Sequence, residues 1–406
     1  MNYLINCNIV FVPGAYNGAI YDFNRNKIFS INHDANTLLL RYVKGNFVME
    51  KDEQEYINRL ELDSLINHNF KPIEYHYRES CLHDLNFAWL EITQACNLRC
   101  VHCYEGQKHI CSNDKLSLIE WKRIIKELHD CGCSNIQFIG GEPACYANVI
   151  DLIDFAGTLK FNSIGFFTNA TLISDDLINC FVKNCVRVNV SIYGHNSEIH
   201  DKITTVNGSF DKMISSVHKM IEHGVNVYAA ITIMKENEKH FEKIIKYVKS
   251  IGMIYSKFDL VRAVSGCRQN CHLTTRRDLI QKKYRTMPKF SITKARFDKA
   301  FYVNTCWHGK FAITENGDVL PCVFERDTSY GNLKNMSVDE LLKSQQLNKY
   351  WYMDFSQIEE CGDCEFRFAC KDCRPLGKLN GGIDKKNIRC LYHPKTGVWT
   401  KIKENL

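Results

Sequence analysis

Glu91-Ile-Thr-Gln-Ala-Cys96-Asn-Leu-Arg-Cys100-Val-His102-Cys103-Tyr104 follows the apolar run Phe87-Ala-Trp-Leu, which is typical of the end of a strand. Its three cysteines are spaced by three and two residues, so one short loop can turn three thiolates toward one point. Iron–sulfur cubanes are held by cysteine thiolates, usually four. The loop therefore predicts a cubane with one iron open to an exogenous ligand. The alternatives are a partial zinc site, although zinc usually takes four ligands, or three buried and inert thiols.

The overall composition is that of an ordinary globular protein, except for its cysteines. At 406 residues the chain exceeds the roughly 100–200 residues of one domain, so two or three units are expected. A net charge of +6 is mild and argues against a dedicated nucleic-acid binder. We find neither an apolar run of roughly 18 residues, as a membrane span requires, nor a secretory signal, and expect a cytoplasmic protein. In a reducing compartment, 20 cysteines favour metal or cluster ligation over disulfides.

The pattern of short strands and helices in residues 1–80 predicts a small separate unit. Three short strands are expected at 6–12, 18–23 and 27–31, and three helices are expected at 37–42, 51–58 and 61–67. This order resembles the winged-helix unit with which maturases of ribosomally made peptides recognise a leader peptide. The resemblance implies that a precursor peptide adds a strand to the edge of the sheet. The alternative is a structural N-terminal cap.

Residues 87–263 alternate between strand and helix patterns. Apolar residues in the first helix, such as Trp121, Ile125 and Leu128, recur at a spacing near 3.6 residues. Repeated β–α units imply a parallel sheet with right-handed crossovers. We therefore expect an α/β fold, a partial (β/α)6 TIM barrel with functional residues at the carboxyl ends of its strands. The expected strands are 89–93, 136–139, 163–168, 187–192, 225–233 and 256–262, and the expected helices are 116–130, 146–159, 174–184, 209–223 and 238–251.

At this point the chain resembles the radical S-adenosylmethionine (SAM) enzymes, whose loop is CxxxCx-aromatic-C. Cys96, Cys100 and Cys103 match the three cysteines, and His102 fills the aromatic position. The resemblance implies that SAM chelates the open iron and that the reduced cluster cleaves it to a 5′-deoxyadenosyl radical. His102 would then pack near the adenine, whereas its alternative role is that of a surface histidine.

Gly140-Gly141-Glu142-Pro143, at the end of the second strand, matches a second segment of that family. Two glycines let a backbone approach a ligand closely, and a carboxylate beside them can accept a hydrogen bond from an ammonium. The resemblance implies that Glu142 contacts the SAM amino group. The alternative is a turn that ends a strand.

Segments at the ends of the third and fourth strands resemble those that meet the SAM ribose in the family. They contain Asn169 and Ser191, although Ala170 replaces the usual glycine after Asn169. Thr204 stands where many relatives carry an arginine, so the resemblance implies no contact from that position to the SAM carboxylate.

The cysteines after residue 305 form a second group, and Gly317 to Cys322 reads as a hairpin that delivers a thiolate. Their order resembles the SPASM extension of radical SAM peptide maturases, which holds two auxiliary clusters. The family usually spaces the last pair by three residues, whereas Cys370 and Cys373 are separated by two. Zinc is the alternative, although its paired motifs usually stand about 15–20 residues apart. The resemblance implies a distal cluster on Cys361, Cys364, Cys370 and Cys390, and a nearer cluster on Cys306, Cys322 and Cys373.

Seven ligands for two cubanes leave one iron of the nearer cluster without a cysteine. We expect that a substrate thiolate can occupy this position. Alternatively, Cys267, Cys271 or His308 closes it.

The resemblance implies a radical SAM/SPASM maturase that uses SAM and three [4Fe–4S] clusters, one SAM-binding and two auxiliary. It would abstract hydrogen from a ribosomal precursor peptide that contains cysteine and form a thioether cross-link, with flavodoxin or ferredoxin as the electron donor. The alternatives are carbon–carbon cross-linking or side-chain oxidation of a peptide or protein, a small-molecule substrate such as a tetrapyrrole, and a non-catalytic iron–sulfur or zinc module. The sequence identifies no general base, and neither nucleic acid nor a membrane is expected as a partner.

Overall fold

The computed structural model describes residues 1–45, 48–67, 70–76, 85–105, 115–262, 272–276, 278–280 and 290–400. Contacts divide the chain into two compact units. Unit 1 comprises residues 1–82, 284–308 and 350–406, and unit 2 comprises residues 83–283 and 309–349. The predicted segments were 1–80, 87–263, 264–305 and 306–395. In the structure, the predicted linker 264–305 belongs partly to each unit. The cysteine-dense segment 306–395 is also divided between the two units.

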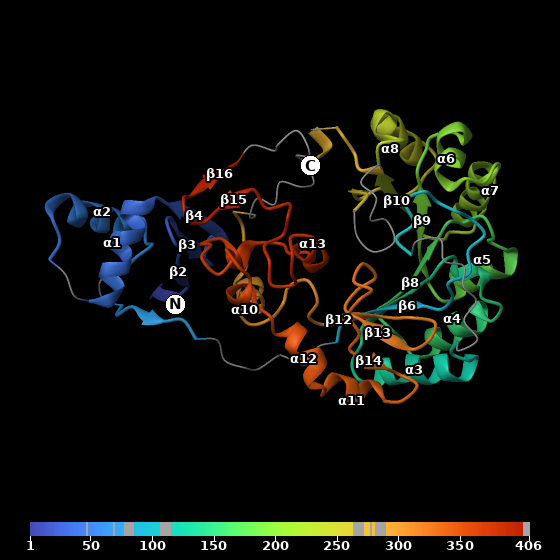
Figure 1. The fold of residues 1–406 in the computed structure, drawn as a ribbon, viewed down its shortest axis with the longest axis horizontal. Helices are drawn as coiled ribbons and strands as arrows, with labels where there is room; N and C mark the ends of the chain where they lie inside the picture. The colour runs from blue at the N-terminus through green and yellow to red at the C-terminus, as the bar shows by residue number, and fades with distance from the viewer. Residues whose placement is uncertain are drawn as a thin grey trace. The chain divides into compact units, whose positions relative to one another are not determined.

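Unit 2 contains a nine-stranded sheet with helices along it (Figure 1). Its strands are β6 Phe87–Glu91, β7 Asn135–Ile139, β8 Ser163–Thr168, β9 Arg187–Ile192, β10 Val227–Ile233, β11 Phe258–Leu260, β12 Lys310–Ile313, β13 Asp318–Leu320 and β14 Gly331–Asn332. Its helices are α3 Leu118–Asp130, α4 Val149–Thr158, α5 Asp175–Lys183, α6 Ser197–Thr204, α7 Ser209–Glu222, α8 Phe241–Ser250 and α11 Val338–Leu342, with short 3-10 turns at Pro143–Cys145 and Glu238–His240.

The sheet order is β11-β10-β9-β8-β7-β6-β12-β13-β14. The six strands β6 to β11 pair in parallel, as the sequence predicts. Their carboxyl ends therefore lie at one edge, and the cysteine loop follows β6 at that edge. The sequence did not predict that β12 pairs in parallel with the other side of β6. The predicted hairpin is present, because β12 turns back through Gly317 into β13, which leads directly to Cys322.

Helix α3 shows why the alternation could be predicted. Ser117 caps its first turn and forms a reciprocal capping box with Glu120, which satisfies backbone donors that the helix leaves free. Trp121, Ile125 and Leu128 are buried on one face. The sequence therefore places both the start of the helix and its buried side. Helix α6 was not predicted, since it spans only eight residues.

Unit 1 begins with an antiparallel sheet in the order β4-β3-β2-β1-β5. The described part contains two helices before residue 76 rather than the predicted three, because the α2 helix ends at Leu62 and Ser64 adopts a left-handed conformation with φ 58°. The predicted helix at 61–67 is therefore wrong. The strands are β1 Tyr3–Asn6, β2 Ile9–Pro13, β3 Gly18–Asp22, β4 Lys27–Ile31 and β5 Ile73–Glu74, and the helices are α1 His33–Lys44 and α2 Lys51–Leu62.

The remaining elements of unit 1 complete the core of this sheet. Helix α10 contributes Phe297, whose ring packs against Tyr21 at 5.0 Å and against Phe368 at 4.8 Å. Tyr21 Oη also donates to the Glu365 carbonyl at 2.9 Å. The N-terminal sheet and the segment that carries Cys364 therefore share one hydrophobic core. The further elements are α10 Lys294–Tyr302, α13 Arg374–Lys378, β15 Tyr392–His393 and β16 Val398–Trp399, with 3-10 turns at Phe355–Gln357 and Arg367–Ala369. Helix α12 Gln345–Trp351 crosses the boundary, because unit 2 ends at Lys349 and unit 1 resumes at Tyr350.

Across the described ranges, none of the helices combines the length and the apolar character that crossing a membrane would require.

Candidate active site

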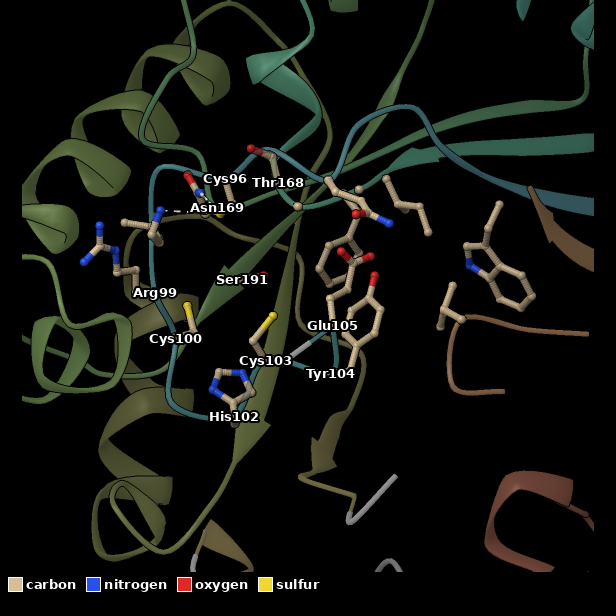
Figure 2. Close-up of a pocket in the computed structure, with 18 of the residues that line it drawn as sticks. Cys96, Arg99, Cys100, His102, Cys103, Tyr104, Glu105, Thr168, Asn169 and Ser191 are labelled. Atoms are coloured by element: carbon tan, nitrogen blue, oxygen red, sulfur yellow. Dashed lines mark hydrogen bonds between the residues drawn. The ribbon is translucent and has the colours of Figure 1, made fainter. Parts of the chain in front are cut away.

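A cavity of about 340 Å³ lies in unit 2 at the carboxyl ends of β6 to β9. Cys96, Cys100 and Cys103 all line it, and Figure 2 shows their sulfur atoms around a common space near Ser191. Burial raises the pKa of Cys96 to about 11 and that of Cys100 to about 12, and nearby thiolates add to both shifts. Thiols in this setting need a cation to become thiolates, so the three sulfurs fit an iron cluster better than three free anions.

The cysteine loop is held against the end of β7 by backbone contacts. Gly141 N–H donates to the Thr93 carbonyl at 2.8 Å. A Cβ atom on Gly141 would lie 2.4 Å from the Gln94 oxygen and 2.5 Å from the Ala95 oxygen, and one on Gly140 would lie 2.2 Å from the Thr93 oxygen. Only glycines allow this approach. Both also line the cavity, so the pair fixes the loop and leaves backbone open to a ligand.

Glu142, the residue after Gly141, is buried and is not among the residues that line the cavity. Its carboxylate accepts hydrogen bonds from Thr168 Oγ1 at 2.7 Å, from Asn169 N–H at 2.6 Å and from Ala144 N–H at 3.1 Å. Burial raises its pKa to about 7, although these hydrogen bonds oppose the shift. The structure thus gives Glu142 a role in joining β7 to β8, and a contact with the SAM amino group remains a prediction.

Asn169 and Ser191 both line the cavity. The Asn169 side chain is largely used within the protein, because Nδ2 donates to Asn97 Oδ1 at 3.0 Å and approaches Cys96 Sγ at 3.9 Å. The next residue, Ala170, has φ 57°, a left-handed conformation that glycine adopts with less strain than alanine. The Ser191 hydroxyl is also used within the protein, because it hydrogen-bonds to Tyr193.

His102 is half-buried and lines the cavity, so it is not a surface histidine. Its ring meets that of Tyr193 edge to face at 4.6 Å. Burial lowers its pKa to about 4, with His272 and His200 adding to the shift, so the ring is neutral near pH 7. A neutral ring beside Tyr193 offers a flat aromatic surface that suits a base such as adenine.

Thr204 is buried, and this agrees with the expectation that its position makes no contact with the SAM carboxylate. Its carbonyl accepts from Arg99 N–H at 3.1 Å, and the Ile203 carbonyl accepts from Val101 N–H at 3.0 Å. The end of α6 therefore gives the cysteine loop a second set of backbone contacts, at Arg99 and Val101.

Sequence reasoning missed one wall of the cavity. It consists of Tyr104 and Glu105, directly after Cys103, and Val323 and Phe324, directly after Cys322. Burial raises the pKa of Glu105 to about 8, and the charge of Glu91 adds to the shift. Adjacency to the two cysteine motifs was the only available signal, because the β12–β13 hairpin that brings the second pair to the cavity depends on long-range pairing.

Four of the predicted auxiliary cysteines form one neighbourhood in unit 1. Burial raises the pKa of Cys361 to about 12 and raises those of Cys364 and Cys370 well above the usual thiol value, and the charges within the set, Cys390 included, add to each shift. Among the described residues, no group of three or more Cys, His, Asp or Glu side chains is arranged to hold a single metal ion.

The other predicted auxiliary ligands are divided between the units. Cys306 and Cys373 belong to unit 1, and Cys322 belongs to unit 2. His308 is buried, with its ring packed against Trp351 at 5.1 Å. Cys267 and Cys271 lie outside the described residues.

The comparisons with known proteins agree with this geometry. Residues 90–248 match the radical SAM superfamily, and residues 306–365 match SPASM, an iron–sulfur cluster-binding domain. The subtilosin biosynthesis protein AlbA of Bacillus subtilis is 24% identical over 74% of this chain and 70% of its own. An AdoMet-dependent heme synthase of Oleidesulfovibrio alaskensis is 24% identical over 76% of this chain and 87% of its own. The structure of Streptococcus suis SuiB matches 95% of this chain and 99% of its own with a TM-score of 0.63 and 16% identity, which shows a shared fold.

The parallel sheet and the three-cysteine loop at its edge define an α/β radical SAM partial barrel. The chain is a radical SAM enzyme with a C-terminal SPASM region. It binds SAM and a [4Fe–4S] cluster, and its SPASM region is an auxiliary iron–sulfur cluster-binding domain. The cavity fits these groups, because it offers three convergent thiols, a glycine-lined backbone and a neutral aromatic pair.

Proposed function

We propose that this enzyme is a peptide maturase that forms a thioether cross-link in a cysteine-containing, ribosomally made precursor peptide. The observation that carries the proposal is the N-terminal sheet, whose core is shared with the segment of Cys364. The match to SuiB extends over 95% of this chain, and SuiB has also been solved bound to its precursor peptide SuiA. AlbA takes part in the biosynthesis of the bacteriocin subtilosin.

The proposed binding surface for the precursor is an edge of the N-terminal sheet. Strand β5 forms one edge with two exposed residues, Ile73 and Glu74. At the other edge, the Ile28 N–H of β4 already donates to the Phe290 carbonyl at 3.1 Å. An extended peptide can add to an edge through main-chain hydrogen bonds. The β5 side is therefore the proposed docking edge, in the manner of a winged-helix recognition unit.

The proposed reaction replaces one S–H bond and one C–H bond of the peptide by one S–C bond. Two electrons and two protons leave the peptide. When bound, SAM and its reduced cluster supply a 5′-deoxyadenosyl radical, which removes one electron and one proton together as a hydrogen atom. The second electron needs an acceptor, and two auxiliary clusters are the redox groups proposed for this. The second proton comes from the thiol.

The chain's own residues have distinct tasks in this proposal. Cys96, Cys100 and Cys103 hold the SAM-binding cluster, and His102 with Ser191 lines the place of the nucleoside. Three [4Fe–4S] clusters are proposed in all. Flavodoxin or ferredoxin is the proposed source of the activating electron. The distal auxiliary cluster is assigned to Cys361, Cys364, Cys370 and Cys390, and the nearer cluster to Cys306, Cys322 and Cys373, with an iron that a substrate thiolate can reach.

The test uses anaerobically reconstituted enzyme, dithionite and SAM with short cysteine-containing peptides encoded beside the gene. The expected result is 5′-deoxyadenosine above a Cys100→Ala control, together with a peptide that has lost two hydrogens and its free thiol. 5′-Deoxyadenosine without any peptide product contradicts the proposal. A peptide that loses hydrogen but keeps its thiol indicates carbon–carbon cross-linking or oxidation instead.

A tetrapyrrole substrate is the second candidate function. It is favoured by the similarity to the AdoMet-dependent heme synthase, which covers 76% of this chain. The same assay with an iron tetrapyrrole in place of peptide separates the two candidates. Turnover that depends on the tetrapyrrole and ignores every peptide would support this second function.

A further inference from the structure

The wall formed by Tyr104, Glu105, Val323 and Phe324 gives the cavity a fixed apolar surface with one carboxyl group in it. Figure 2 shows the side chains of Tyr104 and Glu105 next to each other beyond Cys103. The Phe324 ring meets Tyr104 at 5.8 Å, and the Arg262 guanidinium covers it at 4.5 Å. Contacts from two residues hold the Phe324 ring in place, so the wall is shaped before any substrate arrives.

Glu105 is the polar group of this wall whose hydrogen bonding is incomplete. Its side chain is 11% exposed, and its Oε1 accepts no hydrogen bond from the residues that the structure describes. Among the described residues, Glu105 pairs with Arg326, whose Nη2 lies 3.8 Å from that oxygen. This separation is longer than a hydrogen bond, so none of the residues in the described ranges donates directly to Oε1.

Two carboxylates whose charges act on Glu105, those of Glu91 and Glu315, are each paired with a cation. Arg326 Nη1 donates to both oxygens of Glu91, at 2.6 and 2.8 Å. Lys115 Nζ lies 3.1 Å from Glu315 Oε2. Each of these two cations has a buried partner, and Glu105 is the third carboxylate of the group. A buried acceptor without a donor is costly, and a donor delivered by a ligand removes that cost.

We propose that Glu105 determines substrate specificity by accepting a hydrogen bond from a nitrogen donor of the substrate, while Phe324 covers the adjoining apolar part of the same group. The inference rests on the proposed function, since the donor is taken to belong to the peptide. Two sources share this chemistry. One is the ammonium or guanidinium of a basic side chain, and the other is a main-chain amide N–H.

The test compares Glu105→Gln and Glu105→Ala with the wild type, using the precursor peptide that the enzyme is found to modify. Glu222→Gln, at an exposed position on α7, is the matched control. Glu105→Ala should raise the KM for peptide by about 10-fold or more, because it removes the acceptor of the hydrogen bond. Glu105→Gln keeps a neutral acceptor and should raise the KM by a smaller factor. Iron content and the electron paramagnetic resonance signal with SAM should match the wild type.

Modified peptides identify the donor. If it is a basic side chain, a peptide with norleucine at that position, which has no nitrogen donor, should remove the difference between Glu105→Gln and the wild type. If it is a main-chain amide, N-methylation of that amide should do so. Either result supports the proposal.

An unchanged KM in both Glu105 variants overturns it. A parallel loss of the SAM signal and of peptide binding also overturns it, because Glu105 would then serve the cofactor. Failure of the proposed function is distinguishable, since it shows in the wild type as the absence of any peptide product.

Discussion

Replacing Arg326 by methionine would leave a buried carboxylate without its cation. Glu91 ends β6 and is fully buried, and Arg326, with 19% of its side chain exposed, donates to both carboxylate oxygens. Burial raises the pKa of Glu91, and Arg326 opposes that shift. The Glu91 carboxylate therefore depends on Arg326 to stay charged. The same ion pair also connects β6 to the segment after Cys322.

The expected cost follows from this burial. Removing one partner of a buried ion pair costs about 3–5 kcal/mol. For a unit of this size, each kcal/mol lowers Tm by about 2–4 °C, so the Tm of Arg326→Met should fall by about 6–20 °C. Adding Glu91→Leu should recover most of the loss, because it removes the stranded charge and replaces the pair by apolar groups.

The loss should also depend on pH with a defined sign. A carboxyl group whose folded pKa is raised contributes stability below its unfolded pKa of about 4.3. That stability is lost as the pH rises through the folded pKa, because the folded state binds the proton more tightly. Removing Arg326 raises the folded pKa of Glu91 further. The deficit of Arg326→Met should therefore grow between about pH 5 and pH 8.

Differential scanning calorimetry of the anaerobic, cluster-loaded proteins at both pH values measures these quantities. The four proteins needed are the wild type, Arg326→Met, Glu91→Leu and the double variant. A deficit in Arg326→Met that is equal at both pH values would refute the reasoning. So would a deficit that Glu91→Leu does not repair, because the cost would then come from lost packing of the arginine.

Three further predictions concern the cofactor sites and the shared core. Gly141→Ala should lower 5′-deoxyadenosine formation at least about 10-fold, because its Cβ would meet two backbone oxygens of the cysteine loop; normal turnover would contradict this. Cys361→Ala should lose the iron of one cluster in an iron assay, whereas the exposed Cys7→Ala should lose none; equal losses would refute the assignment. Phe297→Ala should cost about 3–5 kcal/mol and increase hydrogen exchange in both the N-terminal sheet and the segment of Cys364; an effect confined to one would contradict the shared core.

Local patterns made the barrel predictable from the sequence. Helix α3 has its cap at Ser117 and its buried face at helical spacing, and all of this information lies within one segment. The helix predicted at 61–67 failed for an equally local reason, since Ser64 takes a left-handed conformation after Leu62. Propensity alone does not exclude that turn, because serine is tolerated both in helices and at their ends.

The residues of the candidate site were predictable only where a single short motif contains all the side chains that act together. The three cysteines and the two glycines line the cavity as the spacing suggests. Glu142 differs, because its neighbours Thr168 and Asn169 from the next strand occupy its carboxylate, and that pairing is invisible in the Gly-Gly-Glu-Pro motif. Glu105 was missed because its significance depends on which cations surround it, and those come from positions more than 200 residues away, such as Arg326.

The organisation of unit 1 changes how the N-terminal residues should be tested. Deleting residues 1–80 would remove Tyr21 and its partners from the core that also holds Phe368 and the segment of Cys364. Arg367 adds a polar link, since its guanidinium donates both to the Pro13 carbonyl at 3.2 Å and to the Cys364 carbonyl at 2.6 Å. A deletion would therefore lose auxiliary iron whether or not the sheet binds a peptide. Blocking the β5 edge with proline leaves that core intact, so it is the change that separates recognition from folding.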